Sequence, residues 1–358
     1  MDFDAHSDAT LYLVSLIGLA LLFLLLLLIA QILWLRISYN ACLAREKKFL
    51  AIWRPLLMSE ISGIPTTCPP LKARDATFFL NLWNHLQESV KGPAQKRLNA
   101  LAVQTGMAAH AHDLLQKKGL RPRLMALATL GNLQDDTAWN DILALTHSTD
   151  RRLSLSAVSA LLRINAPRAI QALKPALAER TDWPPAQLAI LIQDSGAMDA
   201  TTLLVDFALA LSRSSEPADI LKLQRLLQLM VISPSHEKLL AVRTILQTAR
   251  DSEVITQCLK LLNAPEDLPG IRSHVDHPDW IVRLQAALAL GRIGSPEDLP
   301  LLQKLLSDPV WDVRHRSADA IVGLVNKDRQ RMAGLLDTIE DPFARDMLAM
   351  SLAERRMK

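Results

Sequence analysis

The sequence predicts an all-α protein in which a right-handed α–α superhelical solenoid of paired helices follows one transmembrane helix. Two observations carry this prediction: an uncharged stretch near the N-terminus, and a sequence unit that recurs after 31 residues. The predicted parts are a short N-terminus outside the cytoplasm (1–10), the transmembrane helix (11–35), a basic juxtamembrane segment with a proline-rich connector (36–72), and the solenoid (73–358).

The stretch from residue 11 to residue 35 contains no charged residue and includes five consecutive leucines from Leu24 to Leu28. At 1.5 Å per residue it forms a helix of about 38 Å, enough to cross a hydrocarbon core of about 30 Å. Inside a bilayer every backbone polar group needs a partner, so a single span of this length has to be a helix. Because the span has no ionisable residue, we interpret it as an anchor and not as an ion path.

The flanks of the span predict its orientation. Asp2, Asp4 and Asp8 precede it, and no Lys or Arg does. The residues that follow it carry an excess of positive charge, in Arg36, Arg45, Lys47, Lys48 and Arg54. Cytoplasmic flanks carry the Lys/Arg excess, so we expect the N-terminus outside and the rest of the chain in the cytoplasm, anchored in the plasma (inner) membrane. A cleaved signal peptide would need a basic start and a shorter apolar region, which are absent.

Aromatic and basic residues mark the predicted membrane interface. Tyr12 and Trp34 lie at the two ends of the span, where interfacial aromatic residues are typical. Arg36, Lys47 and Lys48 follow at the cytoplasmic side. Trp53 is predicted to rest on the membrane interface or on a partner protein.

Composition excludes several classes of protein. The formal charge of +3 is too small to indicate nucleic-acid binding, and much of the surplus lies beside the membrane. Cys42, Cys68 and Cys258 are odd in number and far apart, so they predict neither a disulfide framework nor a zinc site. Cys42 is close enough to the membrane for acylation, although an unmodified small apolar residue is the simpler interpretation.

Prolines and a glycine follow the basic segment. They predict that the helix stops near Arg54 and that an extended connector, lying against the domain, runs to Leu71. The residues concerned are Pro55, Gly63, Pro65, Pro69 and Pro70. Helical periodicity resumes near Ala73.

The repeat is the strongest signal in the rest of the chain. The sequence Pro-Glu-Asp-Leu-Pro occupies 265–269 and again 296–300, and 277–283 matches 308–314 at the same offset. Each unit therefore reads as a turn, a helix begun by Pro-Glu-Asp, a second turn, and a longer helix begun near Trp280 or Trp311. We interpret the acidic residues as helix-start residues, because the helix dipole and the free N–H groups favour negative charge there.

The longer helix of each unit has one apolar face. In the first unit that face is Val282, Ala286, Ala289, Leu290 and Ile293, and in the second it is Val313, Ser317, Ala320, Ile321 and Leu324. Less regular copies occupy 124–131 and 155–164. A unit that cannot bury its own apolar face must stack on its neighbours, which predicts a solenoid.

These residues resemble the HEAT-repeat superfamily in its short, phycobilisome-lyase-like variety. The pattern Asp-Pro-x-x-x-Val-Arg-x-x-x-Ala-x-x-Leu is matched at Asp308, Pro309, Val313, Arg314 and Leu324, with Ser317 and Ala318 departing from its alanine spacing. The resemblance is clear over 251–325 and fair over 121–178. Between 182 and 249 the helical period persists without the motif, and 326–358 reads as a truncated capping pair. Such motifs specify architecture well and function poorly.

No catalytic, cofactor or metal site is predicted. The chain has no phosphate-binding GxxxxGK[ST] and no GxSxG. HEAT-like di-iron hydroxylases use several His-Glu pairs, whereas this chain has one, His236-Glu237. His110 and His112 lie about 200° apart on a helix, so they cannot share a metal ion.

The resemblance also implies a structural ladder, in which Arg283 and Arg314 bridge to aspartates at neighbouring turns. The ladder residues are Asp279, Arg283, Asp308 and Arg314. Trp280 and Trp311, like Trp139 and Trp183, are interpreted as packing anchors.

Four residues are predicted to bind a partner protein, and Arg292 and Arg316 among them are expected to be free to pair with acidic groups. The set is Gln285, Arg292, Arg316 and Asp319.

The predicted function is a membrane-anchored scaffold, not an enzyme, that needs no cofactor and binds a membrane-associated protein at the cytoplasmic face. The layout is similar to bacterial inner-membrane HEAT proteins that accompany envelope-polysaccharide glycosyltransferases. Two alternatives stay open: a tethered HEAT-like enzyme (a lyase or a metal-dependent hydroxylase), and a nucleic-acid-binding protein that uses the C-terminal arginines.

Overall fold

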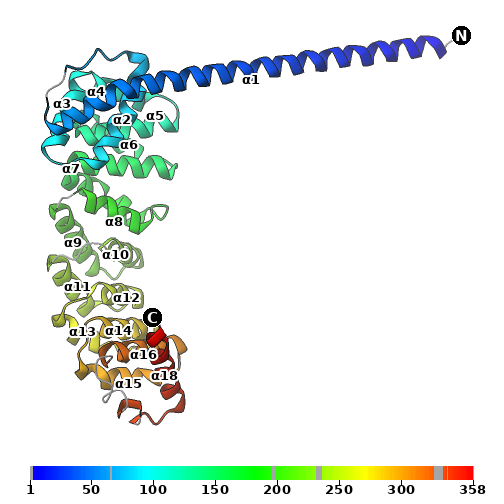
Figure 1. Ribbon diagram of the computed structural model, residues 1–358. Helices are drawn as coiled ribbons and strands as arrows, with labels where there is room; N and C mark the ends of the chain where they lie inside the picture. The colour runs from blue at the N-terminus through cyan, green and yellow to red at the C-terminus, as the bar shows by residue number, and fades with distance from the viewer. Residues whose placement is uncertain are drawn as a thin grey trace. The chain divides into compact units, whose positions relative to one another are not determined.

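The computed structural model describes residues 3–64, 67–195, 198–230, 236–325, 334–336 and 338–357. Its described residues form helices joined by short loops and contain no strand, which confirms the all-α prediction (Figure 1). The chain divides into two compact units, residues 1–133 and 134–358.

Unit 1 begins with α1, a helix of 60 residues that runs from Phe3 to Ser62. Every side chain from Leu21 to Leu35 is exposed. This helix is long and apolar enough to cross a membrane, with a mean hydropathy of 2.4 in its most apolar window. A signal sequence near an N-terminus has the same features.

The predicted extended connector is wrong over residues 54–62, because α1 continues through Pro55. Phe49, Trp53 and Leu57 lie at i, i+4 and i+8 and are 6%, 4% and 0% exposed. A proline inside a helix costs about 3 kcal/mol, while each buried large side chain contributes about 1.5–3 kcal/mol. Burial of this face therefore outweighs the hydrogen bond lost at Pro55.

Arg97 and Gly63 end α1. The Arg97 guanidinium donates from Nε to the Glu60 carbonyl (2.8 Å) and from Nη2 to the Ile61 carbonyl (2.6 Å), which are among the last free carbonyls of the helix. Gly63 has a φ of 81°, a conformation that favours glycine after a helix. The C-terminal end of α1 is thus tied to unit 1 by side-chain packing and by hydrogen bonds.

The rest of unit 1 is a cluster of four helices against which α1 packs. Trp83 is fully buried at its centre and donates from Nε1 to the Leu98 carbonyl (2.9 Å). Asn84 and Thr129 join α2 to α5 through a 2.9 Å hydrogen bond. The helices are α2 (Ala76–Ser89), α3 (Pro93–Gln104), α4 (Met107–Gln116) and α5 (Leu120–Leu133), after the short η1 (Ala73–Asp75).

Unit 2 stacks its helices in sequence order. Its first part contains η2 (Asp136–Ala138), α6 (Trp139–Leu145), α7 (Arg151–Glu179), α8 (Pro185–Asp194), α9 (Met198–Ser212), α10 (Pro217–Leu229), α11 (His236–Thr248) and α12 (Ser252–Leu261). The helix α7 is kinked at Asn165. Its second part contains η4 (Pro265–Asp267), α13 (Leu268–Arg272), α14 (Trp280–Ile293), η5 (Pro296–Asp298), α15 (Leu299–Leu306), α16 (Trp311–Val325) and α18 (Pro342–Met357).

The 31-residue repeat is confirmed in structure. Each Pro-Glu-Asp forms a short 3₁₀ turn that leads into a short helix, and the longer helices α14 and α16 follow. The predicted apolar faces of these helices are buried, except that Ile293 and Leu324 are only half-buried. At Gly291 an added Cβ would lie 2.9 Å from the Ala320 Cβ, so α14 and α16 approach closely there.

Candidate protein-binding surface

Two sets of Arg–Asp pairs join successive helix pairs of unit 2. In the first, Asp267 and Asp298 of the Pro-Glu-Asp turns are 2% and 0% exposed. Arg243 donates to Asp267 Oδ1 (2.5 Å), and Arg272 of the preceding helix donates to Asp298 Oδ1 (2.6 Å). Sequence reasoning missed this set, because it assigned these aspartates to the dipole and free N–H groups of their own helix starts and not to a partner in the neighbouring repeat. The signal was the recurrence of Asp267 as Asp298.

The Asp298 carboxylate is held ionised by its partners. Its second oxygen accepts the Ser295 backbone N–H (2.8 Å). Burial raises the pKa of Asp298, but the hydrogen bonds from Arg272 and Ser295 outweigh burial, so the pKa lies below its ordinary value. The charge is therefore a structural bridge between repeats.

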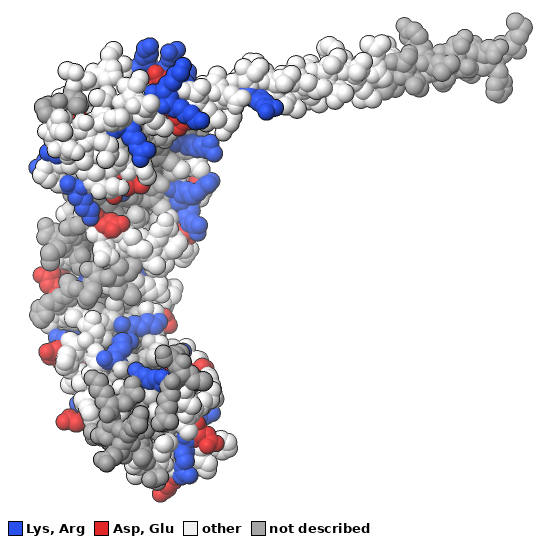
Figure 2. All heavy atoms as spheres, viewed as in Figure 1, with Lys and Arg blue, Asp and Glu red and all other residues white. Residues whose placement is uncertain are grey.

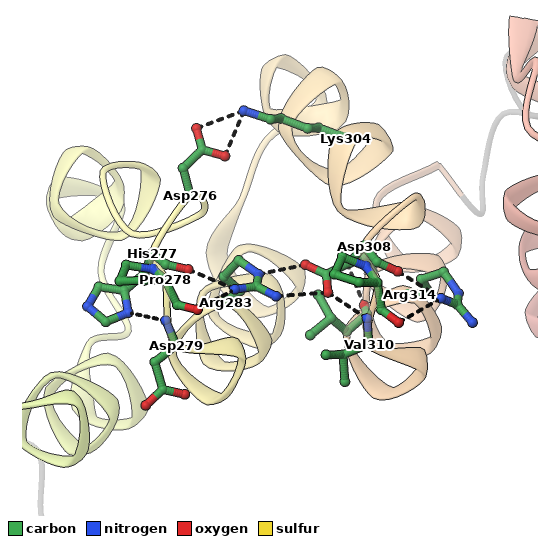
Figure 3. A network of polar contacts seen from close by, with 12 residues as sticks. Asp276, His277, Pro278, Asp279, Arg283, Lys304, Asp308, Val310 and Arg314 are labelled. Atoms are coloured by element: carbon green, nitrogen blue, oxygen red, sulfur yellow. Dashed lines mark hydrogen bonds and ion pairs between the residues drawn. The ribbon is translucent and has the colours of Figure 1, made fainter.

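In the second set, Arg283 of α14 forms a two-pronged pair with Asp308 before α16 (Figure 3). Nε and Nη2 donate to Oδ2 (2.6 Å) and Oδ1 (3.0 Å), while Nη1 donates to the His277 carbonyl (2.8 Å). Asp308 also accepts the Val310 N–H (2.9 Å). Burial raises the pKa of Asp308, and the stronger opposite effect of Arg283 and Val310 lowers it below its ordinary value. The predicted bridge from Arg283 to Asp308 is present.

Among the described residues, the other two predicted ladder residues form no Arg–Asp pair with a neighbouring repeat, although Ser252 of α12 hydrogen-bonds to the Asp279 carboxylate. Asp279 caps α14 by accepting the Ile281 N–H (2.9 Å). Arg314 donates from Nη1 to the Asp308 carbonyl (2.7 Å), and its buried Nε has no hydrogen-bond partner. The residue 31 positions after Asp308 is Ile339, which has no carboxylate. The ladder therefore ends after one full rung.

The tryptophans at the starts of α14 and α16 are exposed, so their assignment as packing anchors is wrong. Trp280 is 39% and Trp311 is 49% exposed, whereas Trp139 and Trp183 are 4% and 0% exposed and do pack in the core. A side chain in the first turn points back beyond the N-terminus of its helix, where no earlier turn covers it. Trp311 stacks on the His315 ring, with centroids 4.9 Å apart.

Ile281 and Phe343, 36% and 78% exposed, lie at the same helix-start level as these tryptophans. We name the set Trp280, Ile281, Trp311 and Phe343 the apolar row. The helices that carry it run parallel. Between α14 and α16, Arg283 meets Asp308 and Gly291 meets Ala320. Between α16 and α18, the same order is seen in the Ser307–Asp341 (3.1 Å) and Ser351–Asp319 (2.6 Å) hydrogen bonds. The helix starts therefore follow one another along one edge of unit 2.

The four predicted partner-binding residues differ in how free they are. Arg292 donates from Nη2 to the carbonyls of Leu259 (2.8 Å) and Leu262 (3.1 Å), so it ties α14 to the end of α12 and is not free as predicted. It also lines a cavity of about 220 Å³ with Lys238 and Lys260.

The other three are the exposed Arg316, the half-buried Gln285, and Asp319. Arg316 is 3.3 Å from Asp319 Oδ2, and Asp319 also accepts the Ser351 hydroxyl. Arg316 is therefore the only one of the four that offers an exposed cation without a bond to another helix among the described residues.

At the predicted membrane interface, Trp34, Arg36, Lys47 and Lys48 are exposed on α1. The side chain of Tyr12 lies outside the described residues. Trp53 is not at an interface, and that prediction is wrong: its ring packs edge-on against Phe79 at 5.2 Å in the core of unit 1.

Among the described residues, no three His, Cys, Asp or Glu side chains lie close enough to hold a metal ion. Of the His236–Glu237 pair, Glu237 accepts the Thr202 hydroxyl (2.9 Å). Burial raises the pKa of the Cys258 thiol to about 12, which keeps it protonated and unreactive.

The architecture defines a class: a solenoid of stacked helix pairs in which one unit repeats with structural bridges between copies. The repeat family follows from a comparison with family models. Residues 233–322 match the model described as HEAT repeats. No curated protein matches the chain.

Solved structures that resemble the chain have low sequence identity to it. An engineered protein is 17% identical, with 84% of this chain and 99% of that chain covered, at a TM-score of 0.31. The structure of human deoxyhypusine hydroxylase in complex with glycerol is 16% identical, with 72% of this chain and 100% of that chain covered, at a TM-score of 0.29. A chain from a structure that describes tubulin recruitment by microtubule polymerases with TOG domain arrays is 12% identical. In that comparison 84% of this chain and 91% of that chain are covered, at a TM-score of 0.33. At these TM-scores the likeness carries no functional argument.

Proposed function

We propose that the protein is a membrane-anchored HEAT-repeat scaffold that binds a protein partner at the cytoplasmic face of the membrane. The observation that carries the proposal is the continuity of α1. One helix joins an exposed apolar stretch to a segment that is buried in unit 1 and capped by Arg97. A segment built in this way transmits a fixed geometry from the bilayer to the domain, which a flexible linker would not do.

The length of the joining segment sets the height of unit 1. Fourteen residue steps separate Leu35, at the end of the predicted span, from Phe49, the first described residue of α1 that is buried. At 1.5 Å per residue they form a stem of about 21 Å. We propose that this stem holds unit 1 beyond the headgroups, at the level of the cytoplasmic domains of other membrane proteins.

The distribution of charge supports the orientation. Residues 36–133 contain 14 Lys and Arg against 5 Asp and Glu, whereas residues 134–358 contain 26 against 29. Figure 2 shows Lys and Arg gathered on unit 1 around the end of α1. An anionic inner leaflet attracts such a segment, with about 1 kcal/mol per Lys or Arg near the surface. Unit 1 is therefore suited to face the membrane.

The partner is proposed to be a protein of the same membrane. Two proteins confined to one bilayer meet at a raised effective concentration, so modest affinity is enough. We retain Arg316, with Asp319 and Gln285, as residues at which the partner is contacted, and give Arg292 a bridging role inside the solenoid. The similarity of the layout to inner-membrane HEAT proteins suggests an envelope-polysaccharide glycosyltransferase as the partner.

Two measurements test the proposal. In isolated membranes the full chain is expected to resist alkaline extraction, and in intact spheroplasts its solenoid is expected to resist added protease. Release by alkali, or digestion from the outside, would refute the anchor or its orientation. A photo-crosslinker at Gln285 or Arg316 should then yield one dominant membrane-protein adduct, and a crosslinker at the exposed Leu240 of α11 serves as the control.

A further inference from the structure

We propose that the apolar row is the docking site for a partner segment that combines apolar side chains with Lys or Arg. This inference rests on the proposed protein-binding function and adds to it a surface and a chemical class of partner. It starts from the tryptophans. Of the seven in the chain, Trp53, Trp83, Trp139 and Trp183 are at most 4% exposed, and Trp34 lies in the apolar stretch of α1. Only Trp280 and Trp311 are exposed on the solenoid.

The row is a local feature and does not follow from the repeat architecture. Three helices that precede α14 in unit 2 begin with a polar residue or proline: Arg151 in α7, Pro217 in α10 and Ser252 in α12. The architecture therefore does not require an aromatic residue at a helix start. Exposed aromatic side chains carry a cost in water, and tryptophan is the residue most enriched where a protein partner removes that cost.

The spacing of the row matches a single extended or helical segment. Neighbouring packed helices lie about 8–10 Å apart, so three parallel helix starts cover roughly 20 Å. Trp311 is in the middle and is supported from beneath by the His315 ring, which is itself largely buried. Because a supported aromatic ring loses little conformational freedom on binding, Trp311 is the expected centre of the docking site.

The charge around the row identifies the partner as basic. The equivalent segments 276–283, 307–314 and 338–345 contain six carboxylates and three arginines. Each arginine is already engaged: Arg283 with Asp308, Arg314 with the Asp308 carbonyl, and Arg345 with the Ile339 carbonyl (2.6 Å). Asp312, directly after Trp311, is exposed, and no described cation pairs with it. Asp308 is paired with Arg283 and Asp276 with Lys304, so the row presents aromatic faces beside a smaller excess of carboxylates, of which Asp312 has no described cation as a partner.

Such a surface selects Lys and Arg over acidic side chains in two ways. Carboxylates attract the cation over several ångströms, and an aromatic face binds it by a cation–π contact worth about 0.5–2 kcal/mol. The structure already contains contacts of this kind, for example between Arg168 and Trp139 at 4.0 Å and between Arg180 and Trp183 at 4.6 Å. The apolar parts of the partner segment would cover Ile281 and Phe343.

The experiment uses the full chain in nanodiscs of neutral phosphatidylcholine and two labelled synthetic 12-residue peptides. One alternates leucine with arginine and lysine, and the other replaces each cation by glutamate. We expect the basic peptide to bind and the acidic one not to bind. Trp280→Ala with Trp311→Ala should weaken binding at least tenfold, and Asp312→Asn should weaken it a few-fold and reduce its salt dependence. Leu240→Ala, which removes an exposed side chain of α11, is the matched control and should change nothing.

Three outcomes would overturn the inference: equal binding of both peptides, binding that survives loss of both tryptophans, or self-association of the full chain that the same substitutions abolish. The last would assign the row to a second copy of this chain. The substituted side chains are exposed, so an unchanged thermal unfolding temperature verifies the fold. Failure here is distinct from failure of the proposed function. If the double variant still crosslinks the membrane partner through Arg316, the scaffold stands and the row is not its docking site.

Discussion

The joint between α14 and α16 and the joint between α16 and α18 are built on the same repeat, but only the first has a complete ion pair. At the first, Arg283 meets both oxygens of Asp308. At the second, Arg314 lies in the same register, yet Ile339 replaces the aspartate and the Arg314 Nε is left without a partner. Stacking of apolar faces is therefore sufficient to join repeats, and the ion pair adds stability and register where it is present.

The largest expected effect is at the buried Asp298, which belongs to the first set of pairs. In Asp298→Ala, the Ser295 N–H and the Arg272 guanidinium lose their acceptor inside the stack. Removing one partner of a buried pair costs about 3–5 kcal/mol, and the partial exposure of Arg272 reduces this to about 2–4 kcal/mol. Urea unfolding measures the loss. Asp276→Ala, which breaks the exposed pair with Lys304, is the control and should leave the unfolding midpoint unchanged.

The comparison of the two joints is tested directly by Arg283→Met and Arg314→Met. The first leaves the buried Asp308 carboxylate without its cation and should cost about 2–3 kcal/mol. The second removes an arginine that bonds only to carbonyls of its own turn and should cost under about 1 kcal/mol. If both variants lose the same free energy of unfolding in urea, the ion pair with Asp308 adds nothing to the hydrogen bonds that both arginines donate to backbone carbonyls.

The repeat and its register could be predicted from sequence, because the 31-residue spacing and the buried faces depend on residue type and period alone. The conformation around Pro55 could not be predicted, since a rule for isolated helices is overridden by the burial of Phe49, Trp53 and Leu57. The exposure of Trp311 could not be predicted either, because it depends on where a side chain lies relative to the next helix.

The same reasoning separates the functional residues. A sequence motif marks Arg283 and Arg314 as equivalent, but their bonds differ because of a residue 25 positions after Arg314, in the next repeat. Arg292 was expected to be free, yet it binds the carbonyl ends of α12. Partners of long cationic side chains are decided by packing between repeats, which local sequence does not describe.

Acidification should weaken the complete joint selectively. The pKa values of Asp298 and Asp308 lie below the ordinary 3.8. A carboxyl whose pKa is lowered by folding stabilises the folded state fully above its unfolded pKa, and this contribution is lost as the pH falls through the folded pKa. We expect the free energy of unfolding to stay constant from pH 7 to about 5. It should decrease once the pH is lower than 3.8, the ordinary pKa of an aspartate.

Arg283→Met sharpens this test. Without the guanidinium, burial raises the pKa of Asp308, so the variant can bind a proton at this site before the wild type does. The difference in free energy of unfolding between wild type and variant should therefore become smaller on acidification. The decrease should be less than the whole difference measured at pH 7, because a protonated Asp308 keeps its hydrogen bond from Val310. A difference that is constant with pH would show that the pair is not electrostatic in origin.

The smallest effect is expected when the missing rung is built. Ile339→Asp places a carboxylate at the position equivalent to Asp308, next to the unpaired Nε of Arg314. Ile339 is 8% exposed, so the single substitution loses apolar burial and is not expected to stabilise the protein by itself. The informative quantity is the coupling energy from a double-mutant cycle with Arg314→Met, which we expect to be about 1 kcal/mol in favour of the pair. A coupling near zero would mean that the last joint is too open to hold an ion pair. The incomplete ladder would then reflect the geometry of α18 and not merely the residue at position 339.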